Sequence, residues 1–290
     1  MALCTGLALL LAVAGCGTTN PGVPIIVIGT KEFTEQWVIG QLWSEALRRK
    51  GFQVEVKNNI GSTTIIDRAL TSGSITVYPE YTGVILQVLA KRDQLPGTAE
   101  ETYRQARDFQ RTRGLGMLAP TPFQNTYSVA VRSSYARDHD LREIGDLRRL
   151  GRITYAEYPD NINSSSGYTG LVSSYGLPDM AVVSLSLGLQ YEALDDGRVE
   201  AADVFTTDPQ LARSDLTLLA DPKNIFGYQN VAPVVAEATL RTLPPEFAET
   251  IDRIDALLTV DAVRVMNRAV TVNRLPPDEV AREFLRANNL

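Results

Sequence analysis

Tyrosines and polar side chains stand where the predicted strands of this chain end, and their types suit the binding of a small cation. The stretch "VYPEYTG" (77–83) places Tyr78 and Tyr81 three residues apart, past a predicted buried strand. Each aromatic face attracts a cation with about 0.5 to 2 kcal/mol, so several rings together approach the roughly 8 kcal/mol of a micromolar site. The residues expected to share one cleft are Lys31, Ser62, Thr63, Tyr81, Asn125, Tyr127, Phe205 and Tyr228.

Three of these residues suit a negatively charged group. Lys31 follows the first predicted strand, and Ser62 and Thr63 lie where a helix is expected to begin after the second strand. Free backbone N–H groups at the start of a helix favour an anion. The whole set predicts a site for a small ligand with a bulky cation, with or without an anionic tail.

The sequence offers little that supports catalysis. His139 is the only histidine, and it lies in the charged stretch "RDHDLRE", which is typical of a solvated loop. A catalytic triad or a zinc site needs further partners at suitable spacing, and none accompany this histidine. No glycine-rich loop of the nucleotide-binding kinds is found in the sequence. We therefore expect a protein that is not an enzyme and that uses no metal or other cofactor.

Length and charge limit the remaining classes of protein. The chain has 290 residues, a formal net charge of −6 and 21% charged residues. These values are typical of a globular protein with one large domain or two modest ones. A nucleic-acid partner requires a basic surface that replaces counterions, so we expect no such partner.

The first residues of the chain are predicted to direct export. "LALLLAVAGC" is an apolar run that is too short for a bilayer, which needs roughly 20 residues, but it suits the core of a signal peptide. Its end, "VAGC", resembles a bacterial lipobox, which implies removal of residues 1–15 and lipidation of Cys16. Residues 16–24 would form a tether that anchors the protein to the outer face of the cytoplasmic membrane. The alternative is an ordinary secretion signal with an incidental cysteine.

Short apolar runs alternate with amphipathic stretches of helical length, and this alternation predicts an α/β fold. Apolar spacing predicts a helix over 34–50, and 75–79 is the third predicted strand. Such alternation favours parallel sheets covered by helices, with ligands bound beyond the carboxyl ends of the strands. Because the pattern repeats, we expect two α/β lobes with a hinge and a central ligand cleft: residues 25–124 plus 229–290 in lobe 1, and 125–228 in lobe 2.

Separate motifs in this order closely resemble the substrate-binding proteins of osmoprotectant ABC importers, the glycine betaine/choline/carnitine-binding family. They are "IGTKEFTEQWVIGQL", "NIGSTTIIDRAL" and "VYPEYTG", and the similarity continues through "NTYSVAV" and "NVAPVV". The resemblance implies a type II periplasmic-binding-protein fold that closes on a quaternary ammonium ligand through a tyrosine cage and then docks on a permease. It also implies that Tyr81 and Tyr127 belong to the cage, that Asn125 is their polar neighbour and that Lys31 lies near a ligand carboxylate.

The chain departs from the family pattern at several of the expected site positions. Val84 stands where relatives have a threonine that can hold the carboxylate, and Phe205 replaces a tyrosine. Another tyrosine position is occupied by Gln229, for which Tyr228 is a possible substitute. A loop arginine is absent, and Asn161 and nearby serines stand in its place. The cation cage is thus largely kept and the carboxylate clamp is reduced, which leaves choline or another quaternary amine open beside betaine.

The sequence as a whole predicts a lipid-anchored solute receptor of an ABC transporter, active as a monomer. It would bind a quaternary ammonium osmoprotectant, such as glycine betaine or choline, and deliver it to the permease in the membrane. One alternative keeps the fold and changes the ligand to another small cationic or amino-acid-like compound. A second alternative is an envelope enzyme or interaction module.

Overall fold

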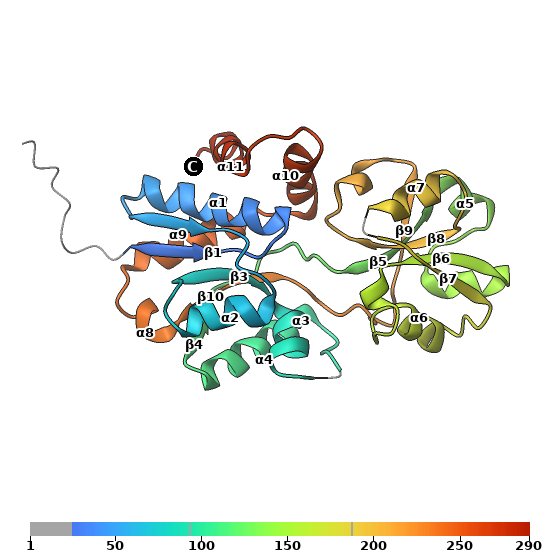
Figure 1. The fold of residues 1–290 in the computed structure, drawn as a ribbon, viewed down its shortest axis with the longest axis horizontal. Helices are drawn as coiled ribbons and strands as arrows, with labels where there is room; N and C mark the ends of the chain where they lie inside the picture. Colours follow the sequence, from blue (N-terminus) through green and yellow to red (C-terminus); the bar gives the residue numbers. More distant parts are fainter. Residues whose placement is uncertain (1–24, 93, 187) are drawn as a thin grey trace, which may run out of the picture.

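Two five-stranded sheets, each covered by helices, divide the chain into two lobes (Figure 1). The structure, a computed structural model, describes residues 25–290 except 93 and 187. The predicted signal peptide, the lipidated Cys16 and the tether all lie outside the described residues. The prediction of two α/β lobes is confirmed.

The first sheet has the strand order β2-β1-β3-β10-β4. β1 pairs in parallel with β2 and β3, whereas β10 runs antiparallel to both β3 and β4. The parallel pairing predicted for the first three strands is confirmed, but the sheet as a whole is mixed, because the chain returns from the other lobe to insert β10 between two earlier strands. The bounds are β1 Ile26–Gly29, β2 Val54–Lys57, β3 Val77–Tyr81, β4 Leu115–Met117 and β10 Val231–Ala236.

The second sheet has the order β7-β6-β8-β5-β9 and is also mixed. β6 is parallel to β7 and β8, and β5 is antiparallel to β8 and β9. In the β5–β8 pair Tyr127 lies directly opposite Phe205, so the register brings two predicted site residues together. The bounds are β5 Tyr127–Arg132, β6 Ile153–Glu157, β7 Met180–Ser184, β8 Ala201–Phe205 and β9 Leu216–Leu219.

Helices cover the faces of both sheets (Figure 1). In the first lobe they are α1 Thr34–Arg49, α2 Thr63–Thr71, α3 Thr82–Val84 with a π-helical turn at Ile85–Leu89, α4 Ala99–Thr112, α8 Glu237–Leu240, α9 Pro245–Asp255, α10 Val260–Thr271 and α11 Pro277–Ala287. In the second lobe they are α5 Ser133–Asp138, α6 Tyr168–Tyr175 and α7 Leu189–Asp195, with short 3-10 turns at Ile144–Leu150, Pro159–Asn161 and Pro209–Ala212. Among the described residues, none of these helices combines the length and the apolar character needed to cross a membrane.

One of the two hydrophobic clusters of the first lobe lies between its sheet and the helices α1, α9 and α11. The helical spacing of apolar residues in α1 turns Leu42 and Trp43 inward, where both are fully buried. Phe247 of α9 packs beside them, edge-on to Phe52. The burial of this face orients α1, so that its first turn points toward the other lobe (Figure 1).

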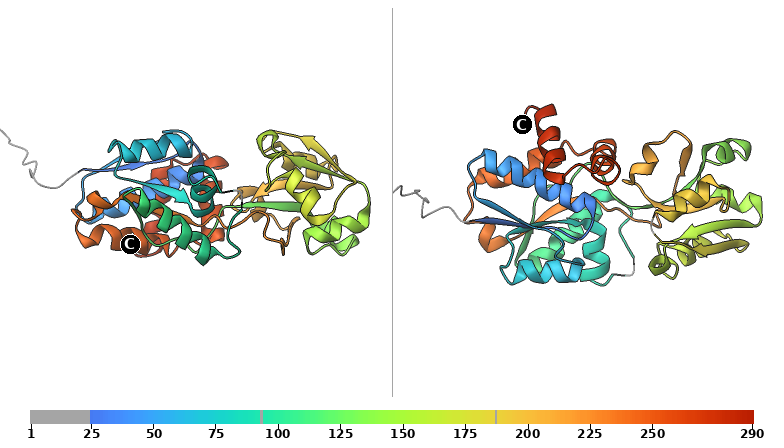
Figure 2. Two further views of the ribbon diagram at one scale, coloured as in Figure 1. Left: turned by 90° about the horizontal axis from the view of Figure 1, so that it is seen from below. Right: turned by 45° about the horizontal axis from the view of Figure 1, so that its top comes forward.

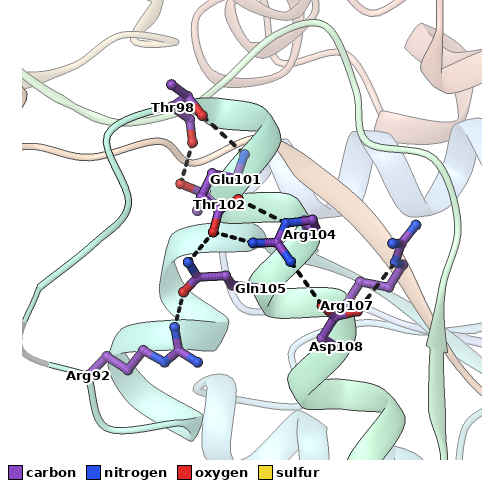
Figure 3. Close-up of polar contacts among 8 residues, drawn as sticks. All are labelled: Arg92, Thr98, Glu101, Thr102, Arg104, Gln105, Arg107 and Asp108. Atoms are coloured by element: carbon purple, nitrogen blue, oxygen red, sulfur yellow. Dashed lines mark hydrogen bonds and ion pairs between the residues drawn. The ribbon is translucent and has the colours of Figure 1, made fainter.

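Helix α4 was not predicted from the sequence, although its start carries a clear signal. The side chain of Thr98 accepts a hydrogen bond from the backbone N–H of Glu101 at 3.2 Å, which caps the helix. Ion pairs then follow its exposed side, including Arg104 with Glu101 and Arg107 with Asp108 (Figure 3). Such exposed pairs stabilise a helix only modestly, so the capping residue is the stronger local determinant.

Two chain segments connect the lobes, and all three views show them side by side between the lobes (Figures 1 and 2). They run antiparallel: Gln124 forms a bridge with Asn230, and the N–H of Asn125 donates to the carbonyl of Gln229 at 3.1 Å. The strands of the first sheet all fall within the residues expected for lobe 1, and those of the second sheet within 125–228. The exact lobe boundaries remain a prediction.

Helix α10 belongs to the first lobe but also contacts the second. The Arg264 guanidinium donates to the carbonyl of Thr206 at 2.8 Å, and the Asn267 amide donates to the carbonyl of Thr207 at 3.2 Å. A third contact between the lobes therefore lies beside the two connecting segments.

Phe247→Ala should lower the free energy of unfolding of the first lobe by about 3 to 5 kcal/mol, because it removes a fully buried ring and leaves a cavity. Urea unfolding followed by circular dichroism measures the effect. Val265→Ala, at a side chain that is 64% exposed, is the matched control and should change the value by less than about 0.5 kcal/mol. Equal midpoints for the two variants would contradict this assignment of the core.

Candidate functional site

A cavity of about 790 Å³ lies between the lobes and is lined by residues of both. Strand ends, the first turn of α1, the connecting segments and α10 all contribute to its wall. Six of the eight predicted site residues line it: Lys31, Thr63, Tyr81, Asn125, Tyr127 and Phe205. Ser62 and Tyr228, the other two, are not among the lining residues.

Aromatic rings face the cavity from both lobes. Phe33 and Tyr81, from the first lobe, are stacked with centroids 6.2 Å apart and an interplanar angle of 23°. Tyr127 and Phe205, from the second lobe, lie 4.7 Å apart at 33°. Phe226 adds a fifth ring to the lining. A ligand in this cavity is therefore approached by ring faces or edges from two directions.

The strand that carries the two tyrosines extends further than predicted. β3 runs from Val77 to Tyr81, so both tyrosines lie within the strand and not past its end. Side chains three positions apart point to opposite faces of a strand. Tyr78 is consequently buried in a hydrophobic cluster beneath the sheet, and only Tyr81 reaches the cavity.

Lys31 lines the cavity, but its charge is already paired. Its ammonium forms an ion pair with the fully buried carboxylate of Glu80 and donates to the hydroxyl of Thr63 at 2.8 Å. The role implied for Lys31 is contact with a ligand carboxylate, and the neighbouring carboxylate of Glu80 weakens its attraction for such a group.

Glu35 also lines the cavity, although the sequence analysis did not select it. One of its carboxylate oxygens accepts from the Tyr81 hydroxyl at 2.6 Å and from the Asn125 amide at 3.2 Å, and the other accepts from the Asn267 amide at 3.4 Å. Burial raises the pKa of Glu35, while hydrogen bonds from Thr207 and from these three residues lower it. Glutamate is common in the first turn of a helix, so its type and position alone do not indicate this role.

The positions that depart from the family pattern lie on the cavity wall. Val84, Gln229, Asn161 and Ser166 all line it. The backbone N–H of Val84 donates to the side-chain oxygen of Gln229 at 3.0 Å. The side chain of Gln229 therefore reaches the cavity at the position where the sequence suggested Tyr228 as a substitute.

Buried acids continue behind the second-lobe wall. Asp208 lines the cavity and accepts from the Tyr191 hydroxyl at 2.6 Å, and burial raises its pKa. Glu157 and Asp203 lie side by side on β6 and β8, and burial, followed by the charge of Glu157, raises the pKa of Asp203 well above its ordinary value. The Asn161 amide donates to Glu157 at 3.1 Å, so this pair helps to position a residue of the cavity wall.

The described part of the chain contains no group of three or more histidine, cysteine or acidic side chains placed to hold a metal ion. His139 is exposed, its ring lies tilted against that of Tyr135, and it does not line the cavity. The interactions that the cavity offers are thus aromatic faces, hydroxyl and amide groups and buried carboxylates.

Comparison with known sequences relates the chain to transport proteins. Residues 24–287 match a family described as the substrate binding domain of the ABC-type glycine betaine transport system. A glycine-betaine-binding protein of Pseudomonas aeruginosa is 30% identical over 275 residues, which cover 91% of this chain and 88% of that protein. An ergothioneine transport permease/ergothioneine binding protein of Helicobacter pylori is 25% identical over 90% of this chain, but over only 47% of its own length.

Solved structures agree with the sequence matches. A crystal structure described as a glycine betaine/carnitine/choline ABC transporter superposes with a TM-score of 0.84 at 23% identity, covering 91% of this chain and 98% of the other. Ligand-free YehZ of Escherichia coli superposes with a TM-score of 0.77 at 25% identity over the same shares of the two chains. The predicted type II periplasmic-binding-protein fold is confirmed.

The stability of the protein should fall with rising pH, in part because of Asp203. Its pKa is raised in the folded state, so above the unfolded value of about 4 the unfolded chain loses a proton that the folded chain keeps. Asp203→Asn removes this effect, and its loss of stability between about pH 5 and pH 8 should be smaller than that of the wild type. Urea unfolding at both pH values measures the difference. Asp138→Asn, at an exposed site, should keep the wild-type slope.

Proposed function

The chain belongs to the family of substrate-binding domains of ABC-type glycine betaine transport systems, and from this we propose that it is an extracytoplasmic receptor for a quaternary ammonium osmoprotectant. The ligand would be glycine betaine, choline or a similar compound, and the protein would deliver it to the permease in the membrane. No catalytic step is part of this function.

The observation that carries the proposal is the pair of aromatic contacts that face one cavity from two lobes. A quaternary ammonium group has no N–H to donate, so its favourable partners are ring faces and negative charge. The cavity has five rings in its wall and two carboxylates, Glu35 and Asp208. Lys31, the lysine of this wall, is paired with Glu80, so it does not leave the site with an uncompensated positive charge.

Delivery follows from the division of the rings between the lobes. Phe33 and Tyr81 belong to one lobe, and Tyr127 and Phe205 to the other. A cation held between them favours the arrangement in which the lobes are close, and a ligand shifts an equilibrium only by such differential contacts. Rotation about the two antiparallel connecting segments is a hinge motion of the known kind. The closed form would then be the form that the permease recognises.

The polar positions of the wall favour one second candidate, a different small cation on the same fold. Gln229 and Asn161 replace a tyrosine and an arginine of the family pattern, and both line the cavity. A relative that covers 90% of this chain is named for ergothioneine, so the fold serves more than one ligand. Calorimetry with choline, glycine betaine and carnitine separates the candidates, because binding of none of them would favour a different ligand.

Lipidation of Cys16 is a further part of the proposal, supported by the "VAGC" motif. Expressed from the full sequence in a bacterial host that lipidates such motifs, the wild-type protein should sediment with membranes. Cys16→Ser should leave it in the soluble extracytoplasmic fraction, because no acyl chain can be attached. Recovery of both proteins in the soluble fraction would contradict lipid anchoring without affecting the ligand proposal.

Tyr127→Ala should weaken binding of a quaternary ammonium ligand at least about tenfold, which corresponds to about 1.4 kcal/mol, because it removes one ring of the second-lobe pair. Titration calorimetry on the mature protein measures the change. Tyr228→Ala is the matched control, since Tyr228 does not line the cavity, and it should bind as the wild type does. Unchanged affinity in Tyr127→Ala would remove that ring from the site.

A further inference from the structure

The hydrogen-bond donors on the Glu35 side of the cavity are already engaged by the protein's own acids. The Tyr81 hydroxyl and the Asn125 and Asn267 amides all donate to Glu35. The Lys31 ammonium donates to Glu80 and to Thr63. A ligand carboxylate needs several donors to replace its water, and this wall has few left to give.

Unpaired acceptors also lie beside Glu35. The side-chain oxygens of Asn125 and Asn267 are buried and accept no hydrogen bond from the described residues. Their amide nitrogens point to acceptors, which fixes the orientation of both amides. Protein atoms cover these oxygens, so they act on a ligand through their partial negative charge, which adds to that of Glu35 and disfavours a ligand carboxylate nearby.

The negative charge around Glu35 also disfavours a ligand carboxylate. The partners of Glu35 that lie at hydrogen-bond distance donate to it, and this surrounding suits an ionised carboxylate that only accepts. Glu35 is 3% exposed, so water screens its charge poorly. Asp208 adds a second acid to the lining, and the Lys31–Glu80 pair adds no net charge.

We infer that the cavity selects a quaternary ammonium ion whose other polar group is a hydroxyl, or is absent, over one that ends in a carboxylate, and that Glu35 sets this preference. The inference rests on the proposed function and specifies its ligand class. It predicts a departure from the relative in Pseudomonas aeruginosa, which is named for glycine betaine.

The test compares three ligands that share the trimethylammonium group. Choline ends in a hydroxyl, glycine betaine ends in a carboxylate, and tetramethylammonium has neither. Titration calorimetry of the wild-type mature protein near neutral pH should show choline binding at least about tenfold more tightly than glycine betaine. Tetramethylammonium should also bind, because the rings and the acids recognise the cation alone.

Glu35→Gln keeps the size of the side chain and one accepting oxygen while it removes the charge. It should reduce the ratio of choline affinity to glycine betaine affinity at least about tenfold. Glu55→Gln removes the same charge from the exposed face of β2 and should leave the ratio unchanged. Retained binding of glycine betaine by Glu35→Gln shows that the variant is folded.

Val84→Thr is a second variant that does not alter a buried charge. It adds a hydroxyl donor to the cavity wall, and should therefore strengthen glycine betaine binding several-fold while tetramethylammonium binding stays the same. This measurement keeps the inference testable if Glu35→Gln does not fold.

The possible failures can be told apart. Glycine betaine binding as tightly as choline would overturn the inference and leave the proposed receptor function intact. A preference for choline that persists in Glu35→Gln would overturn the role of Glu35. Failure of all three ligands to bind the wild type would reject the proposed function together with the inference.

Discussion

A buried carboxylate in the first turn of α1 connects most of what this structure brings together. Glu35 accepts hydrogen bonds from β3, from a connecting segment and from α10, three parts of the chain that are distant in sequence. The α10 residue, Asn267, also donates to the carbonyl of Thr207 in the second lobe. An acid so deeply buried is tolerated only when it is well hydrogen-bonded. Tyr81, one connecting segment and the third interlobe contact are thereby coupled through one side chain.

The antiparallel strands of both sheets help to bring these residues to the cavity. β10 returns from the second lobe to lie between β3 and β4, and its arrival places one connecting segment beside the other. In the second lobe the antiparallel register of β5 and β8 sets Tyr127 against Phe205. The Tyr127–Phe205 ring pair is therefore a product of strand pairing across a long sequence distance and not of a local motif.

The sequence carried enough information for the lobes and for most of the site. Alternating strands and helices predict the two-lobed fold because strand and helix periods differ, and site residues at strand ends follow from that alternation. Lys31, Tyr81, Tyr127 and Phe205 were found in this way. The parallel direction of β1, β2 and β3 was predictable from the helices between them, but the antiparallel direction of β10 was not, because an apolar run has the same pattern whichever way it lies in a sheet.

The remaining site residues depend on contacts that no local pattern encodes. Glu35 and Asn267 are 232 residues apart and meet only when α10 packs beside α1. Tyr228 and Gln229 differ by one position, and only the path of the connecting segment decides which side chain reaches the cavity. Phe33 stands beside residues that were chosen and was overlooked, because an aromatic residue before a helix is more often a packing contact.

The order of the strands along the chain also has a consequence for how the molecule forms. The second lobe is an uninterrupted insertion, so every strand of its sheet has been made once residue 219 is reached. The first sheet lacks a strand between β3 and β4 until residues 231–236 follow. A nascent polypeptide can thus complete the inserted lobe first, while the lobe that begins at the N-terminus is the last to close.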